Sequence, residues 1–102
     1  NRFIVNPKDK VKIRLKGDDK TYQFRVRAFS TDRYNYIKEF TTTGEWQTME
    51  LTLSDLYPSW RGNRLSLPNF DQNQMTGLTF MIANGKKQSF ELLIDSIEIV
   101  SI

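Results

Sequence analysis

The sequence predicts an all-β domain of the β-sandwich or jelly-roll type. Apolar and polar side chains alternate along several short segments, which is the pattern of half-buried strands. Gly, Asp and Asn separate these segments, and no stretch has the spacing of a long amphipathic helix. The pattern gives about seven short strands with frequent turns, as in a sandwich. With 102 residues, the chain is expected to form one domain over residues 1–102.

The strongest alternation lies in residues 10–16 and 21–29, on either side of a Gly-Asp-Asp-Lys turn. Each segment places apolar side chains on one face and polar or basic side chains on the other. We expect the two segments to pair as a β-hairpin. Their basic side chains then share one outer face, which is formed by Lys12, Arg14, Lys16, Arg25 and Arg27.

That basic face has two interpretations. It favours an acidic partner surface, an anionic lipid headgroup or a phosphate. Alternatively, it is a solvated outer face whose charge discourages edge-to-edge pairing. No aromatic side chains are interleaved on it, and a net charge of +3 is low for a nucleic-acid binder, so we expect no nucleic-acid partner.

Two further strands are expected in the middle of the chain. The third covers residues 34–41 and the fourth covers residues 46–53. Residues 54–76 show no clear alternation and are expected to be irregular, with a helical turn at 54–56 or 69–75. An irregular segment of this length is uncommon in a compact domain and indicates function.

Three strands are expected at the end of the chain. Residues 78–83 form the first of them, and Asn84-Gly85 is a strong hairpin signal that pairs it with residues 89–95. Residues 97–102 form the last strand.

Four motifs, taken in order, resemble the complex I intermediate-associated protein family. The first is the alternating apolar and basic segment around the Gly-Asp turn, and the second is a Gly-Glu-Trp before an alternating strand. The third is an aromatic loop that ends in Arg-Gly. The fourth is a Gly-Leu-x-Phe-Met-Ile-Ala strand, followed by an apolar strand that ends in Asp-x-Ile. They occupy residues 10–27, Gly44 to Trp46, Tyr57 to Gly62, and Gly77 to Ala83 with Leu92 to Ile97.

The resemblance implies a galactose-binding-like jelly-roll β-sandwich. The family module has a Gly-rich stretch and early strands before these motifs, and this chain does not contain them. We therefore expect the C-terminal part of the module, with exposed sheet edges that favour association. Eukaryotic members are chaperone-like factors in the assembly of respiratory complex I. The resemblance thus implies a protein-binding module whose partner is a respiratory-complex subunit or an assembly factor.

The aromatic loop is the candidate contact with that partner. An exposed Trp60 beside Arg61 is typical of a protein-interaction hot spot. Alternatively, Trp60 is buried at the end of the sandwich and Arg61 pairs with an acidic side chain such as Asp55 or Asp71. In the first case, the predicted partner-binding residues are Tyr57, Trp60, Arg61, Arg14, Arg25 and Arg27.

A carbohydrate-binding module is the alternative function. Exposed, coplanar aromatic rings with polar neighbours can stack on a glycan, whereas aromatic side chains more often contribute by burial. The predicted sugar-stacking residues are Trp46, Trp60, Tyr34 and Tyr36.

Catalysis is not expected from this sequence. The chain has no His and no Cys, which excludes a Ser-His triad and a thiolate nucleophile. Asp18, Asp19 and Asp32 lie in turns, but their spacing matches no calcium-binding loop, so we expect no metal and no cofactor. No apolar run approaches the length of a membrane span.

Overall fold

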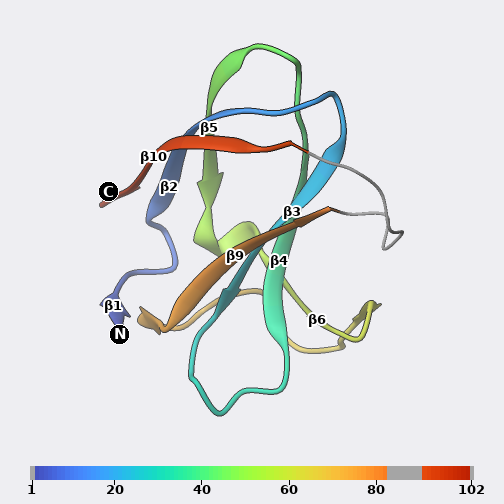
Figure 1. Cartoon of the computed structure of the whole chain (residues 1–102). Coiled ribbons are helices and arrows are strands. Elements are labelled where there is room, and N and C mark those ends of the chain that lie inside the picture. Colours follow the sequence, from blue (N-terminus) through green and yellow to red (C-terminus); the bar gives the residue numbers. More distant parts are fainter. Residues whose placement is uncertain (1, 83–90, 102) are drawn as a thin grey trace.

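The computed structural model describes residues 2–82 and 91–101 and shows an all-β fold, which confirms the predicted class. Three antiparallel sheets are present in the described residues (Figure 1). The first, in the order β10-β2-β5, is built from Leu93–Val100, Lys10–Lys16 and Trp46–Thr52. The second, in the order β7-β6-β4-β3-β9, is built from Asn63–Arg64, Tyr57–Trp60, Asn35–Thr41, Thr21–Arg27 and Gly77–Ile82. A small sheet joins β1 (Phe3–Ile4) to β8 (Gln74–Met75).

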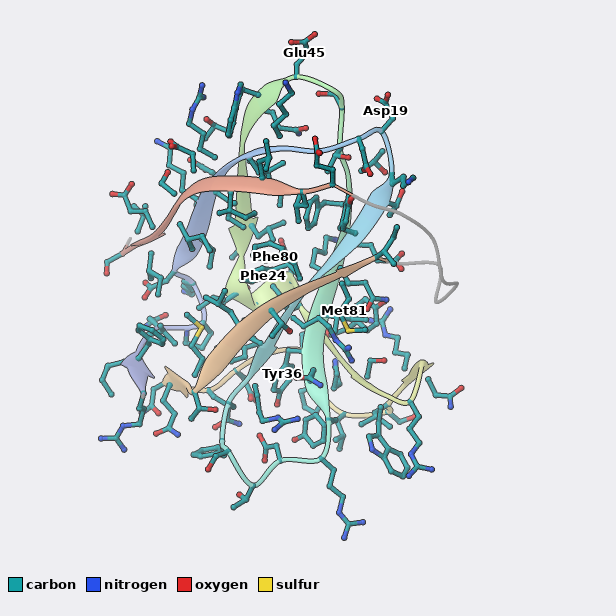
Figure 2. All side chains as sticks on the ribbon, in the orientation of Figure 1. Asp19, Phe24, Tyr36, Glu45, Phe80 and Met81 are labelled. Atoms are coloured by element: carbon teal, nitrogen blue, oxygen red, sulfur yellow. The ribbon has the colours of Figure 1, made fainter. Side chains whose placement is uncertain are left out.

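The three-stranded and five-stranded sheets form a sandwich around one apolar core. β2 and β3 alternate strictly between buried and more exposed residues, because one face of each strand points at the opposite sheet. Phe24 of β3 meets Phe80 of β9 with ring centroids 5.4 Å apart, near the middle of the molecule (Figure 2). The fully buried side chains that anchor the core come from both sheets and their connections, namely Val11, Ile13, Leu15, Phe24, Val26, Leu53, Leu56 and Met75.

The predicted hairpin between residues 10–16 and 21–29 is wrong. β2 pairs with β5 and β10, whereas β3 pairs with β4 and β9, so the turn between them crosses from one sheet to the other. Both strands bury their apolar face in the same core. The alternating pattern is therefore the same whether two strands lie side by side or face each other.

The crossing turn is held by two side chains. Buried Thr42 donates from Oγ1 to the Lys20 carbonyl at 2.8 Å and accepts from the Asp18 amide at 3.3 Å. The Asp18 carboxylate accepts from Tyr22 Oη at 2.8 Å and from the Glu91 amide at 2.9 Å, which ties the turn to the segment before β10. Burial, foremost, and the Asp18 contact raise the pKa of Tyr22 to about 12.

The segment 54–76 is more ordered than the sequence suggests. A 3₁₀ turn at Leu53–Asp55 overlaps the helical turn expected at 54–56. β6 and β7 follow it, and residues 69–75 contain strand β8 rather than a helical turn. β6 shows no alternation in the sequence, because it is short and has two adjacent buried residues, Pro58 and Ser59.

The C-terminal strands also differ from the prediction. Residues 93–100 form one strand, β10, with a bulge between Ile94 and Ser96, where two strands were expected. Among the described residues, β9 pairs with β3, whereas β10 pairs with β2 in the other sheet. The hairpin expected between residues 78–83 and 89–95 is therefore not formed by these two strands. Its Asn84-Gly85 turn lies outside the described residues.

One side of the sandwich covers its core incompletely. Ile97 pairs with the fully buried Ile13 and shares its inward face, yet Ile97 remains 37% exposed. Within the described residues, β10 and β5 end one large sheet and β9 and β7 end the other. These are the edges at which association is predicted. No helix in that part of the chain has the length and apolar character needed to cross a membrane.

Candidate functional site

The basic residues do not share one face, because β2 and β3 belong to different sheets. Lys12, Arg14 and Lys16 lie on the outer face of the three-stranded sheet, and Arg25 and Arg27 lie on the outer face of the five-stranded sheet. The single basic face expected from the sequence is therefore wrong, and each sheet has to be considered separately.

Arg14 has partners within its own sheet. Its Nε lies 3.8 Å from an Asp95 carboxylate oxygen, and its guanidinium lies over the Trp46 ring, 5.5 Å from the centroid. Lys10 similarly lies 3.8 Å from Glu50 across the strand pair. These exposed pairs compensate the charges of Arg14 and Lys10, as is common on a solvated sheet surface.

The outer face of the five-stranded sheet carries a groove that follows β3. It consists of two adjoining hollows, of about 660 and 540 Å³, which share Arg25. Between them the hollows expose three successive outward positions of β3, namely Gln23, Arg25 and Arg27. We call this feature the β3 groove; the side chains that matter most in its walls are Arg2, Asn35, Ile37, Tyr57, Ser59, Arg64 and Met81.

The half-buried guanidinium groups of Arg25 and Arg27 each have one covered donor without a partner in the described residues. The Nε atom of each is buried and has no hydrogen-bond acceptor among the described residues. The Nη1 atom of Arg25 contacts the Met81 sulfur rather than a carboxylate. Because buried polar atoms in folded proteins are nearly always hydrogen-bonded, two such donors in one groove mark a place where an acceptor is missing.

The hollow nearer Arg27 is the more basic of the two. Its walls include Arg2, Arg25 and Arg27 and no acidic side chain. The other hollow contains Glu39, whose carboxylate lies 3.5 Å from Gln23 Nε2. The groove is thus polar along its length, with its positive charge concentrated at the Arg27 end.

The candidate contact loop forms the hairpin turn between β6 and β7. Trp60 pairs with Asn63, and the two residues between them, Arg61 and Gly62, have φ angles of 52° and 81°. Two consecutive positive φ values are those of a type I′ turn, which matches the twist of the flanking strands. The turn is therefore a tight, well-defined corner of the five-stranded sheet.

Trp60 is on the outside of this corner. It is 40% exposed, and the Arg61 guanidinium stacks on its ring, 4.8 Å from the centroid. The alternative of a buried Trp60 therefore does not apply. Next to this pair, Arg64 stacks on Tyr57, 4.5 Å from the ring centroid, and both line the β3 groove. Tyr57 and Ser59 face the groove, whereas Trp60 follows Ser59 on β6 and points to the other face of the sheet, at its edge.

The four predicted sugar-stacking residues do not form one exposed platform. Trp46 is exposed, but it pairs with Lys16 on the outer face of the opposite sheet. Tyr36 is buried in the core, with its ring edge-on to Tyr34 and to Phe70. Burial, foremost, and the Tyr34 contact raise the pKa of Tyr36 well above its usual value. None of the four lines the β3 groove.

The turn carboxylates have local structural roles. Asp18 binds the crossing turn, as described above, and Asp32 accepts from the Phe29 amide at 3.1 Å within its own turn. In residues 2–82 and 91–101, no three acidic side chains gather in a way that would hold a metal ion.

The stacked antiparallel sheets place this chain in the class of β-sandwich domains. Within that class its family is shown by sequence: the model of the Complex I intermediate-associated protein 30 (CIA30) family matches residues 2–94, so the chain belongs to that family. This match confirms the resemblance found in the four motifs. No curated protein matches the chain.

Several residues of the groove could not be recognised from the sequence. Ser59 and Arg64 lie in the segment 54–76, where the sequence shows no clear alternation, and nothing local to Ile37 indicates that it lies at the base of a groove. The useful signal was the alternation of β3, which puts Arg25 and Arg27 opposite its core residues. The alternation predicts that these side chains point outward, but it does not predict to which sheet the strand belongs.

Proposed function

We propose that this chain is a non-catalytic protein-binding module that acts as a chaperone-like factor in the assembly of respiratory complex I. The observation that carries the proposal is the exposed Trp60–Arg61 pair on the type I′ turn. Family membership supplies the biological setting. The assembly role and the partner belong to the proposal.

The chemistry of the pair suits protein recognition. Trp and Arg are the residue types that most often dominate the energy of protein–protein interfaces. Stacking on Trp60 preorganises Arg61, so less conformational entropy is lost when its free donors bind a partner. The tight turn fixes both side chains relative to the sheet.

A glycan is less well supported as the ligand of this surface. A sugar platform needs several exposed rings in one plane, but Trp46 lies on the opposite sheet, Tyr36 is buried and Tyr34 is edge-on to Tyr36. Trp60 is already covered on one face by Arg61.

The test is capture of complex I subunits from solubilised membranes that contain assembly intermediates. The wild-type chain is immobilised, and the retained subunits are identified by mass spectrometry. We expect Trp60→Ala and Arg61→Ala each to reduce the retained subunits at least about tenfold, as hot-spot truncations do.

Trp46→Ala is the matched control. Trp46 is 44% exposed and is also stacked by an arginine, but it lies on the opposite sheet. We expect this variant to retain subunits like the wild type. Equal retention by folded Trp60→Ala and Arg61→Ala variants would refute the proposed contact, and retention of no complex I subunit by the wild type would refute the assembly role.

A further inference from the structure

We infer that the β3 groove binds an extended acidic peptide segment, and that Arg25 and Arg27 each receive one of its carboxylates. The inference deepens the proposed function, on which it rests for the statement that the ligand is a protein. It assigns the segment of the partner that is recognised by its charge.

The spacing of the two arginines fits an extended chain. Arg25 and Arg27 are two residues apart on one strand, so their Cα atoms are about 6.6 Å apart. A peptide in β conformation presents every second side chain on the same side with the same repeat. A segment that lies along β3 with acidic residues at positions i and i+2 therefore meets both guanidinium groups in register.

The missing acceptors indicate the charge of the ligand. Both Nε atoms are buried without a partner in the described residues, and the hollow at the Arg27 end has three arginines and no acid in its walls. Because each Nε is covered in the free chain, the guanidinium has to turn toward the groove before a carboxylate can accept two parallel N–H bonds that include Nε. A neutral ligand would leave the positive charge uncompensated.

The rest of the groove fits the remainder of such a segment. Ile37 is buried at the base of the second hollow, and Met81 lies beside Arg25. These apolar side chains match the CH₂ groups of Glu and a neighbouring apolar residue. Glu39 in the same hollow disfavours further acids there, so the acidic pair belongs at the Arg27 end.

Gly77 leaves the space that the ligand needs. It pairs with Arg27 on β9 and lies in the wall of the basic hollow. A Cβ atom at Gly77 would meet no atom within 4 Å, so a larger side chain there extends into the hollow without a clash in the fold. Gly77→Val thus fills the site while it keeps every charge.

The test is fluorescence anisotropy with a labelled peptide, Ser-Gly-Glu-Val-Glu-Gly-Ser, against the whole chain. The matched peptide has Gln in place of both Glu residues. We expect the Glu peptide to bind at least about tenfold more tightly than the Gln peptide, because a charge-assisted hydrogen bond is stronger than a neutral one. Equal binding of the two peptides would overturn the inference.

Variants of the chain locate the site. We expect Arg25→Gln, Arg27→Gln and Gly77→Val each to weaken binding of the Glu peptide about tenfold or more. Arg14→Gln makes the same charge change on the opposite sheet and is expected to bind like the wild type. If Arg14→Gln weakens binding of the Glu peptide to the same extent, binding depends on net charge alone. That result would overturn the assignment of the peptide to the β3 groove.

Competition decides the class of ligand. Stronger displacement of the labelled peptide by oligogalacturonate than by the unlabelled peptide would overturn the peptide assignment in favour of an acidic glycan. The peptide assay needs no complex I subunit. If the Glu peptide does not bind, the groove assignment is wrong, but the capture of complex I subunits through Trp60 is unaffected. If no complex I subunit is captured, the peptide assay still tests the groove.

Discussion

Gly17→Ala is expected to destabilise the fold by about 2 kcal/mol, although it adds one methyl group in a turn. The new Cβ atom would collide with the side chain of Thr42, at Cβ, Oγ1 and Cγ2. Thr42 cannot move away easily, because it is buried and its hydroxyl bridges the Lys20 carbonyl and the Asp18 amide. Overpacking of this kind costs about 1–3 kcal/mol.

The assay is thermal unfolding followed by circular dichroism. For a domain of this size, a loss of about 2 kcal/mol lowers Tm by about 8–16 °C. Gly44→Ala is the matched control, since a Cβ there meets nothing within 4 Å, and its Tm is expected to stay within about 3 °C of the wild type. If Gly17→Ala unfolds at the wild-type temperature, the close contact that fixes the crossing turn is not present in solution.

Three further outcomes are expected. Phe24→Ala should cost about 3–5 kcal/mol in urea unfolding, because it removes a fully buried ring that contacts Phe80; a cost below about 1 kcal/mol would contradict its central position. Gly62→Ala should cost about 1 kcal/mol, because its φ of +81° disfavours a side chain, and unchanged stability would contradict the type I′ turn. Desolvation raises the pKa of Asp18, but hydrogen bonds from the Glu91 amide and the Tyr22 hydroxyl, with Lys20 nearby, outweigh it and hold the pKa below its usual 3.8. The stabilisation from Asp18 is therefore present above pH 4 and is lost as the pH falls through the lowered value; urea titrations should show this loss in the wild type and not in Asp18→Asn.

The strands with strict alternation could be predicted closely from the sequence. Residues 10–16 match β2, because a strand with one face in the core has to alternate. The pairing of strands could not be predicted in this way, since facing strands and neighbouring strands give the same pattern. β6 was missed for another reason: its adjacent Pro58 and Ser59 are both buried, so it has no period-two signal.

The candidate surface was only partly predictable for the same reasons. Trp60 and Arg61 lie on a turn that local sequence defines, so they could be proposed as a contact before the fold was known. The β3 groove needs β4 and β9, which pair with β3, and β6, which pairs with β4; β6 and β9 are distant from β3 in sequence. Arg14 was grouped with Arg25 and Arg27 by sequence proximity, although they lie on opposite sheets.

The crossing turn between β2 and β3 also affects the order in which the chain can fold during synthesis. β2 is the central strand of its sheet, but its neighbours are residues 46–52 and 93–100. No local hairpin protects it, so one of its backbone edges stays unpaired until residues 93–100 have left the ribosome. We expect this domain to fold late and slowly, and to depend on holding chaperones while it is being made.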